Sequence, residues 1–311
     1  MVPVRVDAGA VIGQHGPMAA APPVDKVREA LAHAVRSRLG GPDGDRRFAE
    51  LVTAAGPRWF AADRPIRTVH ADTSMFIGGL RALLLQTLHP LAMAGVAEHS
   101  GYRTDPWGRL QRTADYLTAT TFGTGEAAEA TIRRVRAVHR RVRGVAPDGR
   151  PYSADDPHLL RWVHLVEVDS FLRAHQTFGV RPLDQAGRDG YVADMAVVAR
   201  KLGVPAPPTS ERGLRDQLHV FRPELRSTRE AREAVRYLLL EPPLPLPARA
   251  PYAVLGAAAV ALLPRWARWP LRLPNLPMLE AVAVMPTAGL TMRTLRWSLT
   301  ASREGHQDQA S

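Results

Sequence analysis

The stretch GRLQRTADYL, residues 108–117, carries side chains that could bind an anion or line a polar cavity. Its Arg109, Arg112, Thr113 and Tyr116 fall at positions i, i+3, i+4 and i+7, so they share one face of a helix. Arginine suits two-point clamping of a carboxylate or a phosphate. A polar stripe of this kind usually faces solvent, but Thr113 and Tyr116 are poor choices for a purely solvated face. The wall of a cavity therefore competes with an exposed, ion-paired surface.

A second stretch, RRVRAVHRRVRG at residues 133–144, places one histidine among arginines. His139 lies on a stripe of aliphatic residues at helical spacing, which comprises Ile132, Val135 and Val142. Its imidazole is therefore predicted to point inward. A core histidine that hydrogen-bonds a carbonyl satisfies this pattern. A neutral imidazole in an apolar wall is also typical of an axial ligand to heme iron. The residues alone leave both alternatives open.

Three further histidines, His89, His99 and His164, stand in apolar sequence. Single histidines of this kind are more often structural than ligating, but together with His139 they favour a cofactor in one helical core. Glu98, beside His99, is either half of an acid/base pair or a carboxylate at a helix end. The sequence contains no H-E-x-x-H pattern, no pair of Glu-x-x-His motifs, no P-loop and no G-x-G-x-x-G or G-x-S-x-G motif.

The elements that must position these residues are helices. No period-2 strand of useful length and no internal repeat is present, so the predicted class is all-α. Pro90 predicts a break at His89, and the run 75–88 is apolar almost all round, which predicts a central buried helix. Helices are predicted over residues 24–39, 44–56, 68–100 with the break, 106–122, 126–144, 155–179, 183–203, 209–221, 228–240 and 278–300.

Proline-rich sequence at EPPLPLPARAP, residues 241–251, separates the tail from the rest of the chain. The predicted organisation is as follows: a flexible lead at 1–23, a helical core domain at 24–240, a linker at 241–251, C-terminal helices at 252–300 that pack on the core, and a flexible tail at 301–311. The lead lacks the apolar core of a signal peptide.

Composition limits the partners. The 311-residue chain carries a formal net charge of +11, yet its positive charge is almost all arginine and its aromatic content is only 6%. The arginines are spread over several helices without a zinc-finger or helix-turn-helix pattern, so no nucleic acid is expected.

The absence of cysteine excludes disulfides and thiolate chemistry and fits a cytoplasmic protein. A segment within 252–273, ALLPRWARWPLRL, mixes apolar residues, tryptophan and arginine as interfacial segments do. One alternative for this segment is peripheral contact with a membrane. The other is an arm that packs over the core.

An ordered set of motifs resembles a known family. The set comprises HADTSMFIGGLRALLLQTLHPLAMAGVAEHSGYRTDPWGRLQRTADYL, then FGT, then VRAVHRRVRG, then YSADDPHLLRWVHLVEVDS, all between about residues 66 and 180. It resembles the domain shared by the bacterial latex-clearing proteins (rubber oxygenases) and the fungal MpaB oxygenase. The resemblance implies a globin-like, all-helical core that holds heme b, with additional N- and C-terminal helices.

The same resemblance implies roles for individual residues. His139 takes the position of the axial ligand, where it coincides with the apolar stripe. Arg109, Arg112 and Thr113 match an Arg-x-x-Lys-Thr motif on the distal side, with Arg112 in place of the lysine. A guanidinium does not readily lose its proton to become a ligand, so Arg112 would instead hydrogen-bond dioxygen or pair with a propionate. Glu98 is the candidate base by its order in the sequence.

The sequence therefore predicts a heme-dependent oxygenase that acts on an apolar, isoprenoid or lipid-like substrate with dioxygen. Two alternatives stay open: a non-catalytic helical binder of an apolar ligand, and a peripheral membrane protein.

Overall fold

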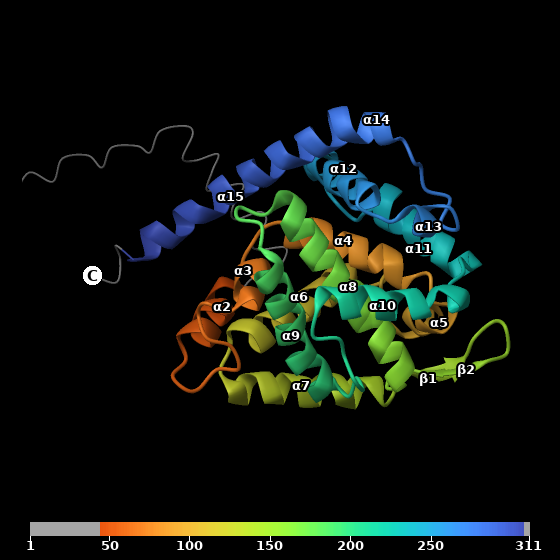
Figure 1. Cartoon of the computed structure of the whole chain (residues 1–311), viewed down its shortest axis with the longest axis horizontal. Helices are drawn as coiled ribbons and strands as arrows, with labels where there is room; N and C mark the ends of the chain where they lie inside the picture. Colours follow the sequence, from red (N-terminus) through yellow and green to blue (C-terminus); the bar gives the residue numbers. More distant parts are fainter. Residues whose placement is uncertain (1–43, 308–311) are drawn as a thin grey trace, which may run out of the picture.

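The computed structural model describes residues 44–307, apart from the side chains of Asp45 and of residues 300–307 (Figure 1). This part of the chain is helical almost throughout, as predicted for an all-α protein. The lead at 1–23 and the helix predicted over 24–39 lie outside the described residues. The elements are α2 (Gly44–Thr53), α3 (Pro65–His70), α4 (Met75–Gln86), α5 (Pro90–His99), α6 (Pro106–Phe122), α7 (Gly125–His139), β1 (Arg143–Val145), β2 (Pro151–Ser153), α8 (Pro157–Phe178), α9 (Gln185–Leu202), α10 (Glu211–Val220), η1 (Arg222–Glu224), α11 (Arg229–Leu240), α12 (Leu246–Ala261), α13 (Arg265–Arg268), α14 (Pro277–Leu279), η2 (Glu280–Val284) and α15 (Met285–Gln307).

Helix α8 is the centre of the fold and contacts α3, α4, α5, α9 and α10 (Figure 1). Trp162, Leu165 and Phe171 are among its buried side chains, and its sequence is apolar on most sides, as expected of an enclosed helix. Helix α4 approaches it closely. A Cβ at Gly78 would stand 2.7 Å from the Phe171 ring and 3.1 Å from the Phe171 Cα, so this crossing requires glycine.

Arg81 is the charged residue of the largely apolar helix α4. Its side chain is buried, and its Nη2 lies 2.7 Å from Asp169 of α8. The same guanidinium donates to Ser170 Oγ at 2.7 Å and to the Leu262 carbonyl at 3.0 Å. One buried cation thus ties α4 to α8 and to the end of α12.

The predicted break at His89 is confirmed. Helices α4 and α5 meet at an angle of 108°, and His89 between them is extended. Proline at the first position of α5 accounts for this, because Pro90 disfavours helical backbone at the residue before it. By length and composition alone this bent pair could cross a membrane, whereas no single helix among the described residues is long and apolar enough to do so.

The helix predicted over 126–144 is wrong at its C-terminal end, and the expectation of no strands is wrong there too. Helix α7 ends at His139, and a two-stranded antiparallel hairpin follows, in which Gly144 pairs with Tyr152. The physical reason is long-range: Tyr152 is 5% exposed because it packs over Gly95 of α5. Burying this ring outweighs continuing an arginine-rich helix over residues 140–144.

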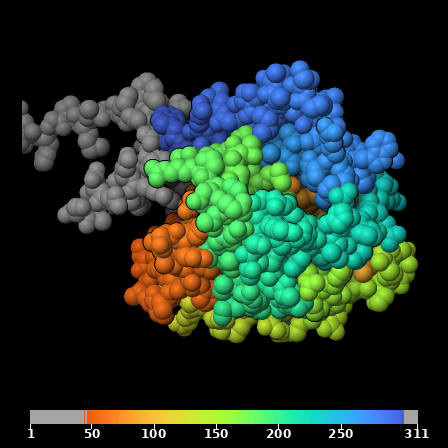
Figure 2. Space-filling view, viewed as in Figure 1, coloured from red at the N-terminus to blue at the C-terminus, as the bar shows by residue number. Residues whose placement is uncertain are grey.

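The C-terminal helices lie along one side of the molecule, where α12 contacts α4, α11 and α15 (Figures 1 and 2). Helix α12 begins at Leu246 and contains Pro251, so only the first part of the linker expected at 241–251 is non-helical. Helix α15 continues to Gln307, into the segment expected as a flexible tail at 301–311. Ala258, Ala259 and Leu263 belong to the main hydrophobic core.

Candidate functional site

His139 is the last residue of α7 and is half-buried. Ile132, one stripe position before it, is buried, and Val135 is half-buried, so the predicted inward face exists. Burial lowers the pKa of His139 below its ordinary value, although the charge of Asp155 opposes this. Among the described residues, no side chain hydrogen-bonds its ring. The imidazole is therefore neutral near pH 7 and has a free nitrogen lone pair.

Arg109 faces partly inward from the first turns of α6. It is half-buried, and its Nη1 donates to Ser100 Oγ at 3.0 Å. Burial lowers the pKa of Arg109, and the nearby charge of Arg112 lowers it further. This hydrogen bond joins α6 to the C-terminal end of α5, where Glu98 lies.

The structure divides the rest of the predicted polar face. Arg112 is exposed and its Nη1 lies 3.1 Å from Asp105, while the exposed Thr113 donates to the Arg109 carbonyl at 3.0 Å. Asp105 caps α6 by accepting from Gly108 N–H, so it holds a negative charge within reach of Arg112. Arg112 and Thr113 therefore lie on the surface and do not line the cavity wall that their spacing suggested.

Glu98 forms a surface cluster with Tyr152 and His99. The Tyr152 hydroxyl donates to the Glu98 carboxylate and lies 3.0 Å from His99 Nε2, while the Glu98 and His99 side chains themselves are 3.9 Å apart. Burial and the Glu98 charge raise the pKa of Tyr152 to about 12. The expected acid/base pair of Glu98 and His99 is thus bridged by a phenol from β2. Gly144 lies directly beneath, since a Cβ there would stand 3.0 Å from Glu98 Oε2.

A buried polar group of side chains, which the sequence did not reveal, lies where α3, α6, α8 and α9 meet. His70 Nδ1 lies 2.7 Å from Thr121 Oγ1, and His70 Nε2 lies 3.3 Å from the Tyr191 hydroxyl. Burial lowers the pKa of His70 to about 3 and raises the pKa of Glu167 to about 7. The Glu167 charge also raises the pKa values of Tyr116 and Tyr191, after burial. The only sequence signal was the acidic Glu167 within the otherwise largely apolar run HLVEVDSF.

The four histidines singled out from the sequence do not share one site. His164 lies one turn before Glu167 on α8, where burial lowers its pKa to about 4 and its Nε2 has no partner. His99 pairs with Tyr152, and His139 ends α7. The core thus offers several neutral imidazoles instead of one common ligand set.

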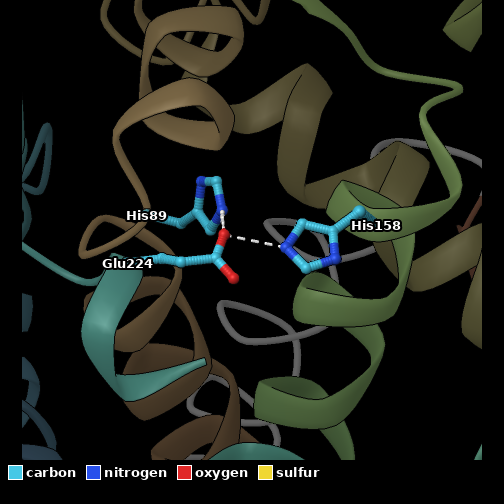
Figure 3. A group of neighbouring side chains, drawn as sticks. All are labelled: His89, His158 and Glu224. Atoms are coloured by element: carbon cyan, nitrogen blue, oxygen red, sulfur yellow. Dashed lines mark hydrogen bonds and ion pairs between the residues drawn. The ribbon is translucent and has the colours of Figure 1, made fainter. Parts of the chain in front are cut away.

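His89 belongs to a different cluster, with His158 and Glu224 (Figure 3). Glu224 Oε2 lies 2.8 Å from His158 Nε2 and 3.5 Å from His89 Nε2. Burial lowers the pKa of His89, and the Glu224 charge opposes this. Two imidazoles and one carboxylate that converge in this way could hold a metal ion. His158 and Glu224 were not anticipated, because 66 residues separate them in the sequence.

Comparison with known proteins assigns the chain to a family. Residues 67–297 match the family described as "ER-bound oxygenase mpaB/B'/Rubber oxygenase, catalytic domain". Neither a search of curated proteins nor a search of solved structures finds a match. The family match runs from within α3 to within α15 and includes Glu98, Arg109 and His139. Because it covers well over half of the chain, the protein belongs to this family of oxygenase catalytic domains.

Proposed function

We propose that this oxygenase uses heme b, with His139 as the axial ligand, to oxidise an apolar substrate with dioxygen. The observation that supports the proposal most is the state of the His139 ring. Burial keeps it neutral, and no side chain among the described residues occupies its nitrogens. A metal ligand must be deprotonated and free, so the ring meets both requirements. When bound, heme supplies the redox-active iron that oxygenase chemistry needs.

Arg109 is the cation that suits a heme propionate. It is already half-buried, and among the described residues its one side-chain hydrogen bond is the one it donates to the Ser100 hydroxyl. Arg112 and Thr113 share the family motif, but Arg112 pairs with Asp105 and Thr113 with the Arg109 carbonyl. Arg112 is proposed to pair with a propionate or to hydrogen-bond dioxygen, and Thr113 to donate a hydrogen bond. Both roles require the present contacts of these side chains to break. Glu98 is proposed as the base, held in place by the Tyr152 hydroxyl.

The state of the polar groups in the core supports the proposal of an apolar, isoprenoid or lipid-like substrate. Burial holds His70 and His164 in their neutral forms and raises the pKa of Glu167 to about 7. Such shifts support a site that holds little water, and a dry site also protects reactive species from side reactions.

The absorption spectrum of the purified protein tests the proposal. We expect a Soret band in the native protein or after reconstitution with hemin, and its loss or displacement in His139→Ala. His219→Ala, which removes an exposed histidine of α10, is the matched control and should leave the band unchanged. A native protein that stays colourless after reconstitution contradicts heme dependence and leaves binding of an apolar ligand without heme as the simpler account.

Peripheral contact of a cytoplasmic enzyme with a membrane is a second proposal. Its support is Trp269, 87% exposed directly after α13, together with Met278 and Val282 at 77% and 70%. Exposed tryptophan near arginines is typical of interfacial segments, and an apolar substrate would partition into the same bilayer.

Vesicle co-sedimentation tests this surface. Truncation at Glu241 is unsuitable, because α12 carries core residues such as Ala258 and Ala259. The double variant Trp269→Ser, Met278→Ser keeps the core, and it should lose binding to anionic phospholipid vesicles that the native protein shows. Equal sedimentation of the two proteins contradicts the assignment to this surface.

A further inference from the structure

We propose that His89, His158 and Glu224 form a binding site for a divalent transition-metal ion such as Zn²⁺, separate from the heme ligand set. The site brings together the start of α5, the first turn of α8 and the end of η1 (Figure 3). One donor atom from each residue lies within 4.8 Å of the other two. Two imidazole nitrogens and a carboxylate oxygen are the donors that zinc sites with an open fourth position use.

The buried side of the site is already arranged for an ion. His89 is 2% exposed, and its Nε2 has no hydrogen bond of good geometry. A buried, unpaired polar atom is costly, so a bound cation would satisfy it. Figure 3 shows that this nitrogen and the His158 ring both point toward the Glu224 carboxylate.

Packing fixes the directions of the two imidazole rings, and a backbone hydrogen bond anchors the segment that carries Glu224. The His158 ring stacks on Phe221 with centroids 4.5 Å apart, and His89 packs against Phe221 and Trp162. The backbone beside Glu224 is anchored next to His89, because Arg226 N–H donates to the Leu88 carbonyl at 2.9 Å. Ligands that are positioned before binding lose little entropy when the ion arrives.

The distances need only small adjustments. Ligand atoms about 2.0 to 2.1 Å from a tetrahedral ion stand about 3.3 Å apart. The present separation from Glu224 to His89 is 3.5 Å, and the 2.8 Å hydrogen bond to His158 would lengthen. On binding, the proton of each imidazole resides on Nδ1. For His89 this gives up only a long contact from Ala92 N–H at 3.5 Å, which is weak at that length.

The surroundings admit both charge and solvent. Arg150 is the nearby cation that acts on both His89 and Glu224, but it is paired with Asp148 at 2.8 Å. The side chains of His158 and Glu224 are 44% and 42% exposed, so an ion and one or more waters can enter from solvent. The ion would join three segments that the chain brings together only on folding, and it should therefore stabilise the native state.

Calorimetric titration of tag-free, full-length protein with Zn²⁺ tests the site. Three proteins are compared: the native chain, the double variant His158→Ala, Glu224→Gln, and the control His219→Ala. The double variant changes two half-exposed side chains, and far-UV circular dichroism verifies its fold. We expect one Zn²⁺ per chain for the native protein and the control, and at least about 100-fold weaker binding in the double variant, since two of three ligands are lost. Zn²⁺ in about 100-fold excess over Kd should also raise the native Tm by roughly 5 °C, but not that of the double variant.

Two results overturn the site: no stoichiometric Zn²⁺ binding by the native protein, or equal affinity in the double variant. The cluster is then a hydrogen-bonded one without an ion. The heme proposal stands or falls separately, because the Soret band responds to His139→Ala and should be unchanged in the double variant.

Discussion

Arg81 and Asp169 form an ion pair that is almost completely withdrawn from water. Arg81 Nη2 and Asp169 Oδ2 are 2.7 Å apart, and the two side chains are 2% and 14% exposed. Each charge is tolerated in the core only because the other is present.

Removal of one partner should destabilise the protein strongly. Arg81→Met leaves Asp169 buried without its cation and frees Ser170 Oγ and the Leu262 carbonyl, so we expect a loss of about 3 to 5 kcal/mol in the free energy of unfolding. Urea denaturation measures this. Arg173→Met removes an exposed arginine of α8, the helix that carries Asp169; it is the control and should change stability by less than about 0.5 kcal/mol. If Arg81→Met and Arg173→Met both change the free energy of unfolding by only a small amount, water reaches the pair of Arg81 and Asp169.

Glu167→Gln should remove a pH dependence of stability. The pKa of Glu167 is raised from 4.5 to about 7 by burial, so between these values the folded protein holds a proton that the unfolded chain has released. Stability therefore falls as pH rises from about 4.5 to 7, by up to about 3 kcal/mol. The variant should match the native protein at pH 4.5 and exceed it at pH 8 in urea denaturation.

The comparison between the two proteins isolates this carboxyl group. His70 and His164 have lowered pKa values and lose stability as pH falls, but both proteins contain them. Exposed Glu126→Gln is the control and should keep the native slope. If the free energy of unfolding of Glu167→Gln depends on pH as that of the native protein does, Glu167 is ionised throughout this range and the prediction is wrong.

Gly144→Ala should separate Tyr152 from Glu98. The added Cβ would lie 2.7 Å from Tyr152 Cζ and 3.0 Å from Glu98 Oε2, so the phenol must move at a cost of about 1 to 3 kcal/mol. The contact with Glu98, which together with burial raises the Tyr152 pKa to about 12, is then lost. The phenol should therefore titrate at lower pH in an absorbance titration. Gly289→Ala, where a Cβ meets nothing within 4 Å, is the control and should leave the titration unchanged.

Arg109→Ala should loosen heme, if the proposed function holds. Loss of a charge-assisted hydrogen bond to a propionate corresponds to about 10- to 100-fold faster heme loss, measured by transfer to an apoglobin acceptor. Arg112→Ala should have a smaller effect, because Arg112 is exposed and paired with Asp105. Equal effects of both variants would show that Arg112 turns inward when heme binds.

Helix positions were predictable from the sequence where local signals set them. Helix α6 spans Pro106–Phe122, which equals its predicted range, because Asp105, Pro106 and Gly123 mark its ends. The C-terminal end of α7 was not predictable, since it depends on burial of Tyr152 against Gly95, more than fifty residues away in the sequence.

The site was predictable to a lesser extent, for a similar reason. The stripe through Ile132 and Val135 predicted that His139 points inward, and the structure places His139 half-buried on the face of the buried Ile132. Helical spacing alone could not show that Arg112 and Thr113 face solvent, because spacing does not reveal which part of a helix face its neighbours cover. The contact of His70 with Tyr191 joins residues 121 positions apart and had no sequence signature.

Asp72 links segments that the ribosome produces far apart in time. Its carboxylate accepts from Ser74 N–H at 2.8 Å and from Val180 N–H at 3.3 Å, and it lies 3.2 Å from Arg296 Nη2, 224 residues further along the chain. During synthesis the core around α8 can form before α15 emerges, but the carboxylate at the start of α4 receives its cation last. Closure of the native structure thus waits for the synthesis of α15, and a product truncated before α15 would expose the surface of α12 that α15 covers.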